Sequence, residues 1–200
     1  VVEVPGQHAG WLALQAGMAA LADGVLIPEL SYDIARLAAA LDAHEQAGRH
    51  PALVVVAEGA RLRDAAPAAV GTVDAMRASL APNADPAYGG GAHVIDRSGA
   101  AAQAVAAALG RLDGRDTLPI VLGLLARTGM ATQVDRQFGL AYGAAAVRTL
   151  LSGGDGVMLA FDPPEVRGIP MREALSRVRA VPARSELVQI ARALGIFLGD

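Results

Sequence analysis

The sequence predicts an α/β fold with an open, mostly parallel sheet and helices on both faces. Short apolar strands alternate with helical stretches from residue 1 to residue 57, and short connections join them. Residues 53–57 form a continuous apolar run, which is typical of a parallel strand buried on both faces. The chain has 200 residues, 53% of them hydrophobic, and this is enough to bury a sizeable core.

The first part of the chain supplies three strands and two helices. Pro5-Gly6 ends the first strand, and Pro28 stops the second. Apolar residues at helical spacing predict the helices, and Ser31 is the expected N-cap of the second one. In chain order, we expect a strand at 1–4, a helix at 8–22, a strand at 25–27, a helix at 31–47 and a strand at 53–57.

The second part continues the alternation after a less regular stretch. A helix within 61–81 is interrupted by Pro67 and Gly71, and a loop is expected at 83–91. We then expect a helix at 98–112, a strand at 118–122, a loop at 126–132, a helix at 133–151, a strand at 157–161, a short edge strand at 166–169 and helices at 171–178 and 185–194.

Composition excludes several classes of function. The net charge is −3, and all seventeen basic residues are arginines without a basic run, which argues against nucleic-acid binding. The absence of cysteine excludes disulfides and thiolate metal sites, and fits a reducing compartment. We expect no membrane association, because no apolar run is long enough to span a bilayer. No signal-peptide pattern opens the chain, so a cytoplasmic location is expected.

Familiar catalytic motifs are absent from the sequence, including the Walker loop, H-E-x-x-H, G-x-S-x-G and G-x-G-x-x-G after a strand. The four histidines lack metal-ligand spacing, and His44 and His50 are expected to be exposed to solvent. The loop Gly89-Gly90-Gly91 could cradle a phosphate. A flexible linker is the favoured interpretation, because the loop neither follows a strand nor opens a helix.

Better candidates stand where α/β sheets bind ligands, at the carboxyl ends of strands. Pro5-Gly6-Gln7-His8 follows the first strand and leads into a helix, whose N–H groups attract anions. Glu58 directly follows the strand at 53–57 and can accept hydrogen bonds from sugar hydroxyls. Arg127 follows the strand at 118–122, and its planar guanidinium suits a phosphate. Taken singly, each has a simpler explanation: a tight turn, a solvated acid or a surface cation.

Taken together and in this order, these places resemble the 6-phosphofructokinase family in its ATP- or pyrophosphate-dependent branches. The resemblance covers nearly the whole chain apart from about 61–97. It is carried by 1–11 (VVEVPGQHAGW), 27–29 (IPE), 54–59 (VVVAEG), 121–129 (VLGLLARTG), 134–136 (VDR), Gly143 with Ala146-Val147, and 191–195 (ARALG).

The resemblance implies a Rossmann-like fold and the transfer of a phosphoryl group from ATP or pyrophosphate, with Mg²⁺, to fructose 6-phosphate in glycolysis. It begins only at the family's second half, so the donor site, the catalytic aspartate and the metal ligands would lie outside this chain, which alone should be inactive. It also implies a homo-oligomer. Residues 1–125 would form the sugar-phosphate domain, 126–180 would pack on the donor-binding domain and expose apolar surface without it, and 181–200 would form a C-terminal helix.

By resemblance, Glu58 matches the acid that binds sugar hydroxyls, and Arg127 matches an arginine that holds the 6-phosphate. Pro5, Gly6 and Gln7 match a turn that lines the sugar site. Four positions depart from the family pattern: Gln7 and Leu118 where arginines are expected, Leu124 where many members have His or Tyr, and Thr128 where Gly is usual. Leu118 and Leu124 are expected to be buried in or beside a strand.

Two alternatives stay open beside the enzyme interpretation. The first is a non-catalytic or regulatory paralogue whose sugar-phosphate site is degenerate, as the missing arginines would favour. The second is a kinase-like member that acts on another phosphorylated sugar. Glu58 and Arg127 favour a working site.

Overall fold

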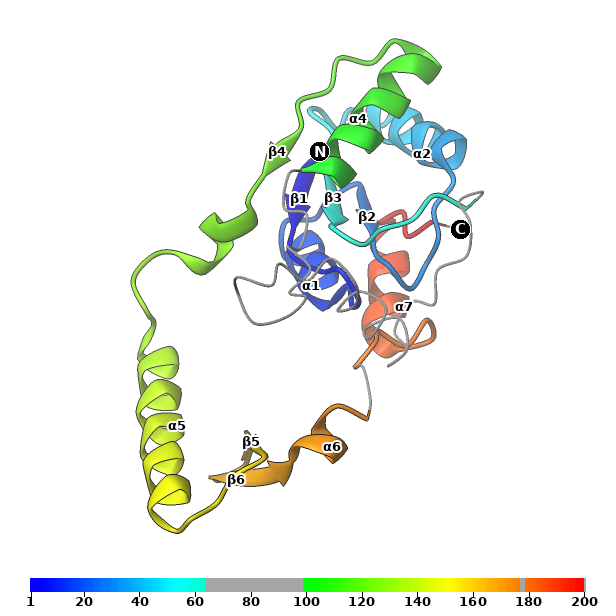
Figure 1. The fold of residues 1–200 in the computed structure, drawn as a ribbon. Helices are drawn as coiled ribbons and strands as arrows, with labels where there is room; N and C mark the ends of the chain where they lie inside the picture. Colours follow the sequence, from blue (N-terminus) through cyan, green and yellow to red (C-terminus); the bar gives the residue numbers. More distant parts are fainter. Residues whose placement is uncertain (64–98, 177–178, 200) are drawn as a thin grey trace, which may run out of the picture. The chain divides into compact units, whose positions relative to one another are not determined.

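A computed structural model describes residues 1–63, 99–176 and 179–199 of the chain (Figure 1). It divides into two compact units, one formed by Val1–Arg127 with Val178–Asp200 and the other by Thr128–Arg177. The glycine-rich loop at 83–91 and most of the helix expected within 61–81 lie outside the described residues. Residue 62 itself is extended, because Leu62 forms a parallel bridge with Tyr32.

A four-stranded parallel sheet forms the centre of the first unit. Its strand order is β2-β3-β1-β4, and each neighbouring pair is parallel. The strands are β1 (Val2–Val4), β2 (Gly24–Leu26), β3 (Val54–Ala57) and β4 (Ile120–Val121). All four residues of β3 are buried, as the apolar run predicted. The predicted α/β class with a mostly parallel sheet is therefore confirmed.

Helices cover both faces of this sheet (Figure 1). They are α1 (Trp11–Ala19), α2 (Ile34–Gln46), α4 (Ala100–Asp113) and α7 (Glu186–Ala193). Successive residues of a strand point to opposite faces, so Val55 joins the core formed with α1 and α7. Its neighbours Val54 and Val56 join the second core, formed with α2 and α4.

The ends of two helices differ from the sequence prediction. Asp33 caps α2 in place of Ser31, because its carboxylate accepts the N–H groups of Ala35 (2.8 Å) and Arg36 (3.1 Å). The N–H of Arg36, and then that of Ala35, hold the pKa of the Asp33 carboxyl below its ordinary value. Helix α1 is shorter than the expected 8–22, and its C-terminal end precedes Leu21, which has a left-handed φ of 49°.

A buried carboxylate, that of Asp23, joins the segments that lead into β2 and β3 at the amino ends of the strands. Asp23 is 4% exposed and precedes β2. Its side chain accepts the N–H of Leu53 at 2.7 Å and contacts His44 Nδ1 at 2.9 Å and Arg49 at 3.4 Å. The expectation that His44 is solvent-exposed is therefore wrong, because its ring contacts the buried Asp23 carboxylate and its side chain is only 18% exposed. His50 is exposed, as expected.

Replacing Asp23 with alanine is expected to lower the free energy of unfolding by about 3 kcal/mol, because buried charge-assisted hydrogen bonds are lost together. Urea unfolding measures the change. Asp42→Ala is the matched control, since it removes a 54% exposed carboxylate from an ion pair with Arg115 and should cost about 1 kcal/mol or less. Equal losses in the two variants would contradict the role given to Asp23.

The second unit combines a long helix with a β-hairpin. Helix α5 (Gln133–Leu151) has the predicted bounds, and a capping box of Thr132 and Asp135 begins it. Hydrogen bonds from the Thr132 side chain and backbone lower the pKa of the Asp135 carboxyl. The antiparallel pair β5 (Val157–Asp162) and β6 (Glu165–Pro170) forms a sheet of its own, and α6 (Met171–Ala174) follows it.

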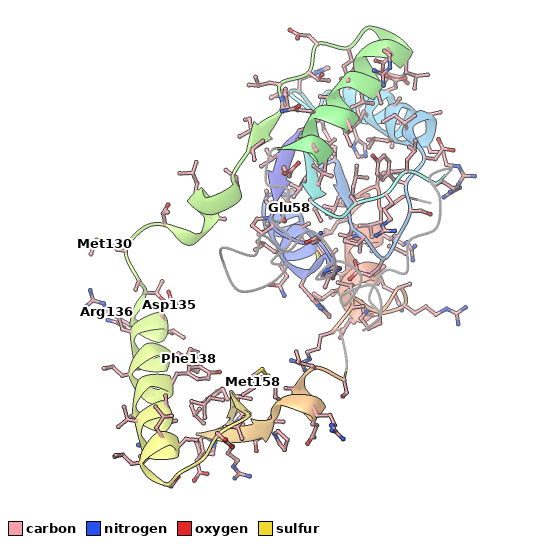
Figure 2. The ribbon with its side chains drawn as sticks, in the orientation of Figure 1. Glu58, Met130, Asp135, Arg136, Phe138 and Met158 are labelled. Atoms are coloured by element: carbon pink, nitrogen blue, oxygen red, sulfur yellow. The ribbon has the colours of Figure 1, made fainter. Side chains whose placement is uncertain are left out.

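Few apolar side chains are buried in this second unit. Phe138 packs edge-on against Phe161 with ring centroids 4.8 Å apart, and Tyr142 accepts the N–H of Phe161 at 3.1 Å. Several large apolar side chains are exposed, as expected for this segment; they include Met130 (91%), Leu140 (76%), Leu150 (73%) and Leu151 (83%). Figure 2 shows Phe138 on the side of α5 that faces the hairpin.

None of the helices in the described ranges is both long and apolar enough to cross a membrane.

Candidate functional site

The candidate residues follow three neighbouring strands at one edge of the sheet. Because β3, β1 and β4 are parallel and adjacent, the segments after them leave from the same carboxyl edge. Pro5-Gly6-Gln7 follows β1, and Glu58 follows β3. Arg127 is the last residue of the short 3₁₀ helix η2 (Gly123–Arg127), which follows β4. Ligands bind at this edge in open α/β sheets.

Backbone hydrogen bonds join the turn after β1 to the segment that carries Glu58 after β3. The N–H of Glu58 donates to the carbonyl of Val4 at 3.2 Å, and the N–H of Gly59 donates to that of Gly6 at 3.1 Å. A Cβ on Gly59 would lie 2.0 Å from the carbonyl oxygen of Gln7, so only glycine fits this approach. The structure thus brings Pro5-Gly6-Gln7 together with Glu58, whose side chain is half-buried beside β1 and β3 (Figure 2).

Helix η2 starts directly beside β1. The N–H of Leu122 donates to the carbonyl of Glu3 at 3.0 Å, which continues the pairing of β4 with β1. The N–H of Leu125 then donates to Leu122 at 2.7 Å and turns the chain into η2. The backbone at Arg127 therefore follows a segment that is anchored to the same edge as the turn at 5–7.

Replacing Gly59 with alanine should separate the turn from the acid, because the new methyl group would collide with the Gln7 backbone. Overpacking of this kind costs about 1–3 kcal/mol of stability, and thermal unfolding measures it. Gly110→Ala in α4 is the control, since its Cβ would meet nothing closer than 3.6 Å. That helical change should be neutral or stabilising. A Gly59 variant as stable as the control would contradict the close approach.

Two buried or half-buried glutamates near this edge were not among the candidate site residues predicted from the sequence. Glu3 is 1% exposed within β1, and its Oε2 accepts the N–H of Ala102 at 2.8 Å, near the start of α4. Glu29 follows β2 and accepts the N–H groups of Gly10 and Val181. Glu3 stands inside an apolar strand, and Glu29 comes three residues after the end of one. A carboxylate inside or close after such a strand, like Glu58, is the signal that could have identified them.

Leu118, one of the positions that depart from the family pattern, is also more exposed than expected. Leu118 is 72% exposed, so the expectation that it is buried in a strand is wrong. Its backbone is held at the sheet, because the amino group of Val1 donates to the Leu118 carbonyl at 2.9 Å, but β4 is the last strand in the sheet order and even Ile120 within it is 43% exposed. Gln7 is half-buried.

The chain's own residues provide no metal centre in the parts that the structure describes. No group of three or more His, Asp or Glu residues there could hold an ion. His44 is engaged with Asp23, and the loop Gly89-Gly90-Gly91 lies outside the described residues.

Comparison with known proteins relates this arrangement to one enzyme family. Residues 1–150 match the family model described as phosphofructokinase. The ATP-dependent 6-phosphofructokinase of Chloroflexus aggregans is 36% identical over 200 residues, covering 100% of this chain and 50% of that protein. That of Spirochaeta thermophila is 35% identical over 201 residues, with the same coverage. The chain thus spans about half the length of the curated relatives it matches.

Solved structures show the same fold. Phosphofructokinase from Saccharomyces cerevisiae matches with a TM-score of 0.60 at 26% identity, covering 96% of this chain and 21% of the other. A pyrophosphate-dependent phosphofructokinase from Marinobacter aquaeolei also has a TM-score of 0.60, over 97% of this chain and 46% of its own; at 20% identity it supports the fold alone. The family match over 1–150, and the parallel sheet with its interlocked carboxyl edge, lead to one conclusion: the chain belongs to the phosphofructokinase family.

Proposed function

We propose that this chain is the sugar-phosphate-binding part of a 6-phosphofructokinase, which transfers a phosphoryl group from ATP or pyrophosphate to the 1-hydroxyl of fructose 6-phosphate in glycolysis. The observation that carries the proposal is the interlocking of the turn at 5–7 with Glu58, at the edge from which η2 leaves. In this proposal, a phosphorylated sugar bound at this edge would contact the Glu58 carboxylate and the Arg127 guanidinium.

Each candidate residue would have a distinct role in binding. Glu58 would accept hydrogen bonds from sugar hydroxyls, and Pro5, Gly6 and Gln7 would line the sugar. Arg127 would donate two parallel hydrogen bonds to the 6-phosphate, because its planar guanidinium matches phosphate oxygens. Such contacts position the acceptor hydroxyl, and positioning with electrostatic stabilisation supplies most of the catalysis in phosphoryl transfer.

In this proposal, the donor site, the catalytic aspartate and the Mg²⁺ ligands lie in the half of the family fold that precedes the matched part. The curated relatives are about twice the length of the matched segment, which supports the division. The isolated chain would therefore be inactive. We further propose that the complete enzyme is cytoplasmic and homo-oligomeric, and that it binds neither nucleic acid nor membranes.

The second unit, Thr128–Arg177, is proposed to pack on the donor-binding half. Its exposed apolar side chains, such as Met130 and Leu151, support this, because a stable unit rarely leaves so much apolar surface uncovered. In limited proteolysis of the isolated chain, the first cuts are expected between 128 and 177. In the full-length protein the same bonds should be protected. Equal cutting in both would contradict the packing.

A non-catalytic paralogue with a degenerate site is the second candidate, and Gln7 and Leu118 favour it because arginines are expected at both positions. Calorimetric titration of fructose 6-phosphate into the full-length protein separates the two. Binding at millimolar concentration or tighter supports the enzyme. No detectable heat would favour the paralogue, and tighter binding of a different phosphorylated sugar would favour a kinase for that sugar.

A further inference from the structure

One carboxylate joins three segments beside the candidate site. Glu29 lies just after β2, and both of its carboxylate oxygens accept the N–H of Gly10 at 3.1 Å. Its Oε1 also accepts the N–H of Val181 at 2.7 Å. The side chain thus connects the end of β2, the loop at 5–10 and the segment that leads to α7, all within the first unit.

The Gly10 end of this loop is closely packed. Gly10 is buried, and a Cβ there would lie 2.3 Å from Ile27 Cβ and 3.0 Å from Glu29 Oε2. Its carbonyl accepts the N–H of Leu14 at 2.9 Å and so begins α1. The carboxylate lies near the amino terminus of that helix, where the helix dipole favours negative charge.

The other end of the loop is held by the candidate site itself, through the hydrogen bond from Gly59 to Gly6. The loop at 5–10 is therefore held at Gly6 and at Gly10. The contact at Gly10 depends on the Glu29 side chain, whereas the hydrogen bond at Gly6 joins two backbone groups. Removing that side chain would leave the N–H of Gly10 without its acceptor at a buried position, which favours a rearranged loop.

A second contact limits what the loss of Glu29 would do to the rest of the unit. Trp11 Nε1 donates to the carbonyl of Arg179 at 2.6 Å, so α1 and the segment before Val181 stay joined without Glu29. The consequence of losing the carboxylate should thus fall on the loop more than on the packing of α1 and α7.

We propose that Glu29 is a positioning residue for the sugar-phosphate site: it holds the loop at 5–10 so that Pro5, Gly6 and Gln7 keep their place against Glu58. This inference rests on the proposed function. Glu29 acts through the loop and does not touch the sugar phosphate. Losing it should weaken binding without removing any group that contacts the ligand.

The test compares Glu29→Ala and Glu29→Gln in the full-length protein by two measurements. Hydrogen exchange at the amides of 6–10 should become faster in Glu29→Ala, with little change at β3. The dissociation constant for fructose 6-phosphate should rise about tenfold, which corresponds to about 1.4 kcal/mol. Glu29→Gln keeps one acceptor oxygen. Its exchange rates at 6–10 and its dissociation constant should therefore stay close to those of the unaltered protein.

Asp23→Ala is the matched control, because it removes a buried carboxylate bound to a backbone N–H at the opposite edge of the sheet. It should lower the unfolding temperature yet leave the exchange of 6–10 and the dissociation constant unchanged below that temperature. If Asp23→Ala weakens binding as much as Glu29→Ala, the effect is general destabilisation and the inference is wrong.

The remaining outcomes separate this inference from the proposed function. Normal binding by Glu29→Ala, or unchanged exchange at 6–10, overturns the positioning role while the unaltered protein still binds. Absence of fructose 6-phosphate binding by the unaltered protein overturns the proposed function, and the positioning role with it.

Discussion

Replacing Arg127 with alanine is expected to raise the dissociation constant for fructose 6-phosphate by about tenfold to a hundredfold. A charge-assisted hydrogen bond contributes about 1.5–3 kcal/mol, and each 1.4 kcal/mol is about a factor of ten in affinity. Arg127→Lys keeps the charge but loses the two-pronged geometry, so its affinity should fall between the other two. Calorimetry on the full-length protein measures all three constants.

Arg111→Ala serves as the control for this prediction. Arg111 is an exposed arginine in the last turn of α4, and the same charge is removed there. Helix α4 ends before β4 begins, so Arg111 lies toward the amino edge of the sheet, away from the candidate site. Fructose 6-phosphate should bind to this variant as to the unaltered protein. An equal loss in both variants would mean that net charge, and not a phosphate contact, governs binding.

Replacing Gln7 with arginine is expected to strengthen the binding of fructose 6-phosphate by about tenfold or more, by the same free energy per charged hydrogen bond. Gln7 stands where the family pattern has arginine, and its backbone already packs against Gly59. Its side chain is half-buried, so a longer side chain can extend toward solvent. The affinity is again measured by calorimetry.

Gln15→Arg is the matched control for the gain. It makes the same substitution at an exposed position of α1, so it tests the added charge alone. Affinity should not change in this variant. If Gln7→Arg binds no better than the unaltered protein, the turn at 5–7 does not line the sugar-phosphate site, or the site is degenerate beyond one missing charge.

The parallel sheet could be predicted from the sequence because buried strands carry their own signal. Four consecutive buried residues in β3 require an unbroken apolar run, and 53–57 supplies it. Helix α5 has the bounds that the apolar spacing predicted, and the structure shows that a capping box of Thr132 and Asp135 sets its start. Placing the candidate residues after strands also predicted that the turn at 5–7 and Glu58 would meet at one edge.

The features that the sequence did not predict depend on contacts between residues far apart in the chain. Asp33 replaces Ser31 as a helix cap because residues 61–63 pair with Tyr32 and keep it extended, and no local pattern reveals that pairing. Leu118 is exposed because β4 is the last strand in the sheet order, which depends on how distant strands pair. Glu29 is separated from Val181 by 152 residues, so its role becomes visible only in the fold.

The most direct test is a crystal structure of the full-length protein with fructose 6-phosphate bound. We expect the sugar hydroxyls within hydrogen-bond distance of the Glu58 carboxylate, the 6-phosphate against the Arg127 guanidinium, and the ring beside the turn at 5–7. A structure in which the carboxylate and the guanidinium lie on opposite sides of the molecule, or in which the ligand binds elsewhere, would contradict the proposed site.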